Sequence, residues 1–229
     1  MEDLLYNPVY NALLYHDAHL GSSAGEVRFF DEAISPFAGF PTGYAKGFTD
    51  LHKVLPAGRK ILYAKPDPIE QPEGWQIIAS IEGLQFIFNE KNRLQEPAII
   101  PALLNNDHVQ EMIQLAQLTK PGPFGPRTIE FGYYYGIFEN GQLAAMTGQR
   151  LHAGNFSELS AVCTHPDHLG KGFAAALLTQ QVKLIQSQGR KAFLHVRADN
   201  ERAIALYKRI GFEVSRPMFF YFMKRVDLL

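Results

Sequence analysis

The chain has 229 residues, of which 46% are hydrophobic and 12% aromatic, and this is enough apolar material for a sizeable core. Its 22 Lys and Arg residues balance 23 Asp and Glu residues to a net charge of -1, without the basic surplus of a nucleic-acid-binding protein. No stretch approaches the roughly 20 apolar residues of a membrane span, and the acidic start Met1-Glu2-Asp3 is unlike a signal peptide. We therefore expect a cytoplasmic protein with no nucleic-acid or membrane partner.

The first part of the chain has strand-like runs separated by segments rich in glycine and proline. The sequence predicts strands at 27–30, 60–64 and 75–89, and loops at 21–25 and 65–74. The charged segment Asn89-Glu90-Lys91-Asn92-Arg93 ends this pattern, and more regular elements follow it. We place a domain boundary there, between a mixed α/β half, residues 1–94, and a second domain, residues 95–229.

The second domain is predicted to alternate strands and helices. A strand over 99–104 precedes a helix that Asp107 can N-cap, and this helix must end before residues 120–126, which contain three prolines and two glycines. Asn140-Gly141 lies between two strand-like runs, which is a strong hairpin signal. The remaining predicted strands are 133–138, 142–150, 159–163, 192–196, 212–214 and 218–223, and the remaining helices are 174–189 and 200–211.

The turn Leu169-Gly170-Lys171-Gly172-Phe173-Ala174 leads from a strand into a helix. The first N–H groups of a helix have no internal partners, and the helix dipole favours negative charge beside them. Gly170 and Gly172 let the backbone approach a ligand closely, and Lys171 adds a cation. The pattern indicates a phosphate-binding turn, although a plain strand-to-helix turn in which the glycines only serve geometry is the alternative.

Two other nucleotide motifs fit this turn poorly. A P-loop requires Lys after its last glycine, whereas Phe173 follows Gly172. The letters Gly170-x-Gly172-x-x-Ala175 satisfy the dinucleotide pattern, but six residues, 164–169, separate the strand from the first glycine. A dinucleotide-binding protein therefore remains a weaker hypothesis.

Three segments together resemble the GNAT superfamily of N-acetyltransferases. They are the strand and loop 159–166, the turn 169–174, and the helix in which Asn200, Ala203, Tyr207 and Gly211 recur at fixed spacing. They follow that family's order and spacing over residues 98–225, and the glycine N-acyltransferase-like branch is the most similar. The resemblance implies an α/β (α+β) fold with a mixed, mainly antiparallel twisted sheet flanked by helices, behind an N-terminal α/β half.

The resemblance also implies acetyl-CoA as the co-substrate, with no metal. The residues that it assigns to CoA binding are Ala161, Val162, Cys163, Leu169, Gly170, Lys171, Gly172, Phe173, Ala174, Asn200, Ala203 and Tyr207. In the family, the fourth strand splays from the fifth and pairs with the pantetheine arm, which here points to 161–163. Leu169 stands where the family has Gln or Arg, so the pyrophosphate would be held chiefly by backbone N–H groups.

The implied chemistry is transfer of an acetyl or other acyl group to a primary amine by direct attack in a ternary complex. Tyr207 is the candidate acid for the departing thiolate, and Glu158, at the start of the fourth strand, is the candidate base, acting directly or through a water. A backbone N–H near Val162 would meet the oxyanion. The acceptor would be a small amine, an amino acid or a peptide.

Residues 119–126 and the aromatic side chains of Phe131, Tyr133, Tyr134 and Tyr135 are predicted to determine acceptor specificity. A CoA-binding sensor without catalysis is the alternative function, because Leu169 departs from the motif and the N-terminal half is unassigned. That half is either a degenerate second acyltransferase-like domain or a lid and dimerisation element, which would make the protein a homodimer.

The single cysteine and most of the remaining histidines are predicted to be structural. Cys163 is the only cysteine, which excludes an internal disulfide, and its apolar setting indicates a buried side chain rather than a nucleophile. The segments His16-Asp17-Ala18-His19 and His165-Pro166-Asp167-His168 contain metal-ligand types, but short loops of this kind more often form caps and turns. For His152 two interpretations remain: a contact near the substrate, or an exposed side chain.

Overall fold

A large sheet of eight strands organises the computed structural model, which describes residues 3–94, 96–97 and 99–228. Its strand order is β4-β11-β5-β10-β9-β8-β7-β6. The strands are β4 (Lys60–Lys65), β5 (Trp75–Phe88), β6 (Ala102–Leu103), β7 (Tyr135–Glu139), β8 (Gln142–Arg150), β9 (Phe156–Thr164), β10 (Lys191–Arg197) and β11 (Phe212–Arg225). All neighbours are antiparallel except β9 and β10, so the prediction of a mixed, mainly antiparallel sheet flanked by helices is confirmed.

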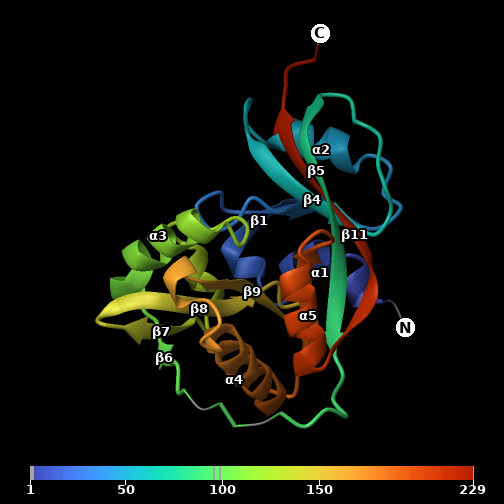
Figure 1. Ribbon diagram of the computed structural model, residues 1–229. Helices are drawn as coiled ribbons and strands as arrows, with labels where there is room; N and C mark the ends of the chain where they lie inside the picture. Colours follow the sequence, from blue (N-terminus) through green and yellow to red (C-terminus); the bar gives the residue numbers. More distant parts are fainter. Residues whose placement is uncertain (1–2, 95, 98, 229) are drawn as a thin grey trace.

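Helices cover both faces of this sheet (Figure 1). They are α1 (Pro8–Leu14), α2 (Gly47–Val54), α3 (Val109–Thr119), α4 (Phe173–Ser187) and α5 (Glu201–Ile210). Apolar residues of α1 and α3 share one core cluster with Phe193, whereas those of α4 and α5 share another with Leu194. Because neighbouring residues of a strand point to opposite faces, α1 and α3 lie on one side of β10 and α4 and α5 on the other. None of the helices in the described part of the chain combines the length and apolar character that crossing a membrane requires.

The N-terminal half contributes a small sheet and two strands of the large one. The small sheet consists of β1 (Gly21–Ala24), β2 (Val27–Phe30) and β3 (Ala38–Gly39), and β1 replaces the loop predicted at 21–25. Strand β5 lies between β10 and β11, pairing antiparallel with both. The large sheet therefore joins strands from both sides of residue 94, and the domain boundary placed there stays a prediction.

Three local predictions in the second half need correction. The strand predicted at 99–104 is only the two-residue β6. Asn105, rather than Asp107, accepts the capping hydrogen bond, and it caps a short 3-10 turn before α3. The strands predicted at 212–214 and 218–223 are one strand, β11, with a register shift between Val214 and Arg216 that bends it without ending it.

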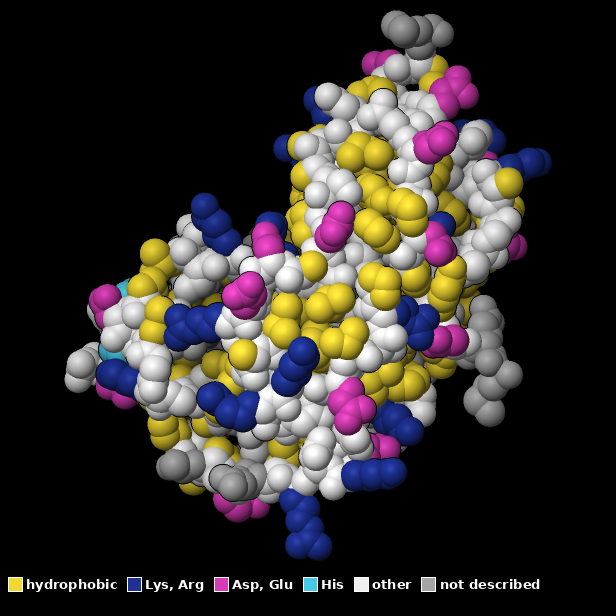
Figure 2. All heavy atoms as spheres, turned by 45° about the vertical axis from the view of Figure 1, so that its right-hand side comes forward, with side chains coloured by type: hydrophobic (Ala, Val, Ile, Leu, Met, Phe, Trp, Pro, Cys, Tyr) yellow, Lys and Arg dark blue, Asp and Glu magenta, His cyan; other side chains and the backbone are white. Residues whose placement is uncertain are grey.

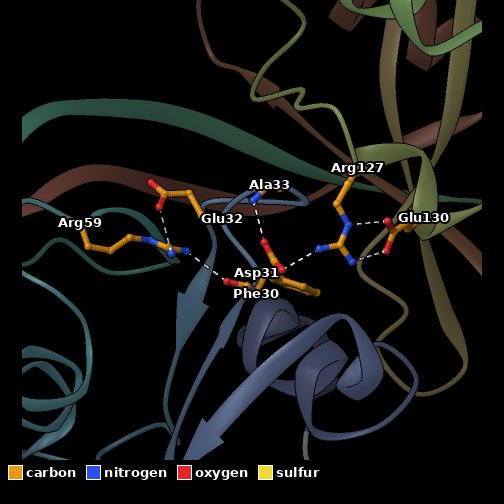
Figure 3. A network of polar contacts seen from close by, with 7 residues as sticks. All are labelled: Phe30, Asp31, Glu32, Ala33, Arg59, Arg127 and Glu130. Carbon is orange, nitrogen blue, oxygen red and sulfur yellow. Dashed lines mark hydrogen bonds and ion pairs between the residues drawn. The ribbon is translucent and has the colours of Figure 1, made fainter.

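Two arginines tie the loop after β2 to distant parts of the chain (Figure 3). Arg127 donates to Asp31 at 2.7 Å and to Glu130, while Arg59 donates to the Phe30 carbonyl at 3.1 Å. Next to this network, the Thr128 hydroxyl donates to the Ile34 carbonyl at 2.6 Å. Arg127 and Thr128 thus hold the segment that leads to Phe37 against the segment that follows α3, and Arg59 holds the end of β2 against the start of β4.

Candidate active site

Strands β9 and β10 separate partway along their length. They pair in parallel only from Phe156 to Leu159 on β9, although β9 continues to Thr164 and β10 to Arg197. On the other side of β9, the register with β8 shifts between Met146 and Gly148, and Ala161 has a φ of 52°. The outer half of β9 therefore presents backbone groups toward the opening between the two strands, as expected for a strand that splays from its neighbour.

The turn before α4 leaves the first N–H groups of the helix free. Gly172 is the N-cap residue and has no side chain that could accept from these groups, and Ala176 is the first residue of the helix whose N–H is bonded within the described part of the chain. Gly170 and Gly172 have φ values of 83° and 80°, and a Cβ added to either would meet no atom within 4 Å. The glycines are thus required by their left-handed backbone, and the space in front of them is open, so the close approach to a ligand expected from the sequence stays a prediction.

A cavity of about 650 Å³ lies along this turn and the outer half of β9. Ten residues predicted to bind CoA line it: Val162, Cys163, Leu169, Gly170, Gly172, Phe173, Ala174, Asn200, Ala203 and Tyr207. Lys171 does not line it, and its ammonium lies 2.9 Å from His168 Nδ1 and 3.7 Å from Glu139. Ala161 lines a second cavity instead.

Two arginines of α5 supply positive charge to the first cavity. Arg202 and Arg209 line it together with His168, and none of the three was predicted from the sequence. Arg202 and Arg209 are seven residues apart, two helical turns, and therefore share a face of α5 with Leu206. Figure 2 shows Lys and Arg side chains gathered on the lower part of the molecule, where Figure 1 places α4 and α5. The seven-residue spacing of Arg202 and Arg209 is the signal in the sequence that could have identified the two arginines.

A second cavity, of about 350 Å³, adjoins the first. Five residues line both: Thr119, Val162, Asn200, Ala203 and Tyr207. Its walls come from both halves of the chain and include apolar Phe37, Ile81 and Phe220 and basic Lys120, Arg150 and Arg197. The residues shared by the two cavities form the junction, where a group in one cavity can reach a group in the other.

Tyr207 lies at this junction. Its side chain is only 6% exposed and packs against the rings of Phe86 and Phe212, with centroids 6.2 and 6.1 Å away. Burial raises the pKa of the Tyr207 phenol well above its usual value, so the hydroxyl keeps its proton at neutral pH. A neutral phenol at the junction can donate a hydrogen bond, or a proton, to a leaving group.

Glu158 is fully buried and lines neither cavity. Arg150 donates to both of its oxygens at 2.8 Å, and His195 Nδ1 lies 2.7 Å from Oε1. Burial would raise the pKa of this carboxyl, but Arg150 and His195 outweigh burial and lower the pKa to about 2. The general-base role of Glu158 stays a prediction, and a carboxylate held in this way is a poor acceptor for an amine's proton.

His195 connects Glu158 to the second cavity, which it lines. Gln85 Nε2 lies 3.1 Å from His195 Nε2 and also donates to the Leu5 carbonyl at 2.9 Å. Since the carboxylate can only accept and the amide nitrogen can only donate, the His195 proton is assigned to Nδ1 and Nε2 carries the lone pair. Sequence reasoning missed His195, although a histidine between Leu194 and Val196 in an otherwise buried strand was a signal.

The remaining sequence predictions have mixed outcomes in the structure. Residues 119–123 line the second cavity, but the aromatic residues Phe131, Tyr133, Tyr134 and Tyr135 do not. Phe131 and Tyr134 are instead buried in the core, because they pack behind β8. His152 is neither exposed nor beside a cavity: it is buried, and Asp17 accepts from both its Nδ1 and its backbone N–H at 2.8 Å.

Cys163 and the loop from His165 to His168 have structural surroundings. Burial raises the pKa of the Cys163 thiol to about 11, so it is not a ready nucleophile. His165 Nδ1 accepts from the backbone N–H of Asp167 and thereby caps a turn. Within the described residues, no group of three or more His, Cys, Asp or Glu side chains is placed to hold a metal ion.

Similarity to known proteins agrees with this geometry. The family model for FR47-like proteins matches residues 134–220. The chain is 32% identical to a protein of Novosphingobium aromaticivorans assigned as an acetyltransferase from the GNAT family; the match covers 99% of this chain and 100% of that one, with a TM-score of 0.89. A GCN5-related N-acetyltransferase from Kribbella flavida is 16% identical over 93% of both chains, with a TM-score of 0.62, and shares the fold.

One curated relative is similar over a shorter stretch. Mycothiol acetyltransferase from Paenarthrobacter aurescens (strain TC1) is 32% identical over 87 residues, which are 35% of this chain and 27% of that protein. The match therefore spans about a quarter of that relative, too little to carry its acceptor over to this chain.

Proposed function

The chain belongs to the GNAT family of acetyltransferases, and on this premise we propose that it transfers an acetyl group from acetyl-CoA to a primary amine. CoA occupies the first cavity and the amine occupies the second, and the amine attacks the thioester directly in a ternary complex. The observation that carries the proposal is that the two cavities meet at Tyr207, Val162 and Asn200. The closer likeness to glycine N-acyltransferases stays a prediction.

The first cavity offers binding groups for the phosphates and the pantetheine arm of CoA. Free N–H groups at the start of α4 bind the pyrophosphate, and Arg202 and Arg209 supply charge for the phosphates. The unpaired backbone of β9 next to Val162 pairs with the pantetheine arm. With the arm lying along β9, the thioester reaches the junction with the second cavity.

The reaction needs a neutral amine, a stabilised oxyanion and a proton for the thiolate. The neutral amine attacks the thioester carbon, and the Val162 N–H stabilises the oxyanion. As the carbon–sulfur bond breaks, Tyr207 donates its proton to sulfur, and the amide nitrogen loses its extra proton to water, from which Tyr207 is reprotonated. Before this attack, the ammonium group of the acceptor loses its proton to His195 through a water. Among the described side chains lining the second cavity, His195 is the one that offers a nitrogen lone pair, on Nε2, to take that proton.

Glu158 acts as a positioning residue for His195 in this mechanism. Its carboxylate keeps the proton on Nδ1 and leaves Nε2 as the basic nitrogen, which must give up the hydrogen bond from Gln85 before it takes a proton. When Nε2 takes a proton, the amide of Gln85 can turn so that its oxygen, buried without a partner among the described residues, accepts the new N–H. That turn replaces the hydrogen bond from Gln85 to Leu5.

Two measurements on the purified chain test the proposal. Calorimetric titration with acetyl-CoA should give one site per chain, and a thiol-release assay with a broad panel of amines should yield free CoA with at least one of them. Absence of acetyl-CoA binding would refute the proposal. Binding without release from any amine would favour the CoA-binding sensor instead.

The His195→Gln variant tests the assignment of the base. It should lower kcat by about 10²-fold near neutral pH, the usual contribution of a general base, with acetyl-CoA affinity unchanged. Raising the pH should restore part of kcat, because solvent then deprotonates the amine. A variant with the same pH profile as the wild-type chain would exclude His195 as the base.

A further inference from the structure

The second cavity is lined by basic side chains and by no acidic one. Lys120, Arg150 and Arg197 line it, and no Asp or Glu is among the described residues that do so. The Arg150 side chain is 12% exposed, whereas that of Arg197 is 59% exposed and pairs with Asp199 at 2.7 Å. Arg150 thus lies inside the cavity, and Lys120 and Arg197 lie toward solvent.

Arg150 is held in one orientation with one edge of its guanidinium unused. Its Nε and Nη2 each donate to Glu158 at 2.8 Å, and its Cζ lies 4.9 Å from the centre of the Phe37 ring. No described residue accepts from Nη1, and Nη1 is not among the buried atoms that lack a partner, so solvent or a ligand can reach it. Two N–H donors of a fixed cation are therefore available to an anion or a carbonyl oxygen.

Apolar side chains form one part of the wall. Leu62, Ile81, Phe220 and Phe222 line the cavity on the side formed by β4, β5 and β11, and Phe37, which precedes β3, lines it beside Leu62. A volume of about 350 Å³ is at the small end of the range for small-molecule sites. The cavity therefore suits a compact ligand that has one apolar side and one anionic group, and it disfavours a polycationic acceptor.

We propose that the acceptor is an amino acid with an apolar or aromatic side chain, whose carboxylate binds Arg150 Nη1. This inference rests on the proposed acetyl transfer. With the carboxylate at Arg150, the amine lies toward the junction at Tyr207, and the side chain contacts Phe37 and Phe220. Lys120 and Arg197 draw the carboxylate toward the opening.

Three matched acceptors test the carboxylate directly in the thiol-release assay. L-phenylalanine, L-phenylalaninamide and 2-phenylethylamine share the amine and ring but differ in the group that Arg150 would bind. After correction for the fraction of neutral amine, kcat/KM should be at least about tenfold higher for the acid, the effect of one charge-assisted hydrogen bond. The same comparison with leucine, leucinamide and isoamylamine should give the same order.

Variants locate the binding group. Arg150→Lys keeps the charge beside Glu158 but lacks the free Nη1 edge, so KM for phenylalanine should rise by about tenfold while KM for acetyl-CoA stays constant. Lys120→Gln lies near the opening, where the side chain is exposed, and should raise the same KM by about two- to threefold, less at high salt. Lys224→Gln, an exposed lysine of β11 outside both cavities, is the matched control and should change neither KM.

The outcomes separate this inference from the proposed function. Equal or faster turnover of the amide and amine would overturn the carboxylate site while acetyl transfer stands. If none of these six compounds releases free CoA but another amine of the broad panel does, the carboxylate site is overturned and acetyl transfer still stands. Failure of the whole panel would remove the proposed transfer as well. If Arg150→Lys does not fold, as judged by acetyl-CoA binding, the acid-over-amide ratio and Lys120→Gln still decide the case.

Discussion

The two adjoining cavities are built in different ways. The first is lined by residues within two segments, 162–175 and 200–209, with Thr119 of α3 as the one addition among the described residues, and the groups that it offers a ligand include free backbone N–H groups. The second gathers side chains from separate parts of the chain, among them Phe37, Arg150, His195 and Phe220. Backbone recognition tolerates a changed side chain, whereas recognition by side chains does not. The cavities should therefore respond separately to substitution, and the following predictions test that separation.

The largest effect is expected from Glu158→Gln, which leaves Arg150 buried without its counter-charge. Removing one partner of a buried pair costs about 3–5 kcal/mol, so the free energy of unfolding should fall by that amount in a urea titration. If the protein still folds, acetyl-CoA affinity should persist while the pH dependence of kcat/KM changes through His195. Glu130→Gln, which breaks an exposed pair with Arg127, is the control and should cost less than about 1 kcal/mol. A similar loss in both variants would contradict the assignment.

Acid should destabilise the wild-type chain through the same carboxyl. Its pKa is about 2 when folded and about 4.5 when unperturbed. A lowered pKa stabilises the folded state above the unfolded value, and that contribution, about 3 kcal/mol, is lost as the pH falls from about 4.5 to about 2. Urea titrations at several pH values should show this slope. The slope should be smaller in Glu158→Gln, and an unchanged slope would assign acid unfolding to other groups.

Tyr207→Phe tests the junction, which belongs to both cavities. Loss of the phenolic proton donor should lower kcat by about 10²-fold, equivalent to about 2.7 kcal/mol, with little change in either KM. Steady-state thiol release gives all three constants. An equal loss in acetyl-CoA affinity would assign Tyr207 to binding instead.

The smallest effects are expected at the turn before α4. Gly172→Ala has room for its Cβ but must adopt a φ near 80°, which costs about 1–2 kcal/mol and should weaken acetyl-CoA binding by about tenfold. Leu169→Ala, whose side chain is 46% exposed, should change the affinity less than about twofold, because only its backbone is used. Calorimetry measures both. A larger effect of the Leu169 substitution would show that side chains matter in the first cavity too.

Features that depend on near neighbours in the chain were predictable from the sequence. Asn200 accepts from the Ala203 N–H at 3.1 Å and caps α5, and Gly211 ends it with a φ of 116°, as its position after the helix indicated. Asn140-Gly141 forms the predicted turn between β7 and β8. These features need only a few consecutive residues, so a single sequence carries their full signal.

Features that depend on strand order were not predictable. The contact of Arg150 with Glu158 requires the register of β8 with β9, and that of His195 with Gln85 requires β10 to pair with β5. The partners of His195 lie 37 and 110 residues away along the chain. Neither local propensity nor periodicity specifies which strands become neighbours, so Arg150 and His195 of the second cavity were missed, although residues 119–123 were predicted to contact the acceptor.

The position of β5 between β10 and β11 has a consequence for how the protein folds. The centre of the sheet cannot close until β11, residues 212–225, has been synthesised, because β5 and β4 both pair with that strand. Contacts between such distant segments close late and slowly, and until then the edges of β4 and β5 are unpaired and open to other chains. We expect truncations before β11 to aggregate during synthesis rather than to yield a smaller folded unit.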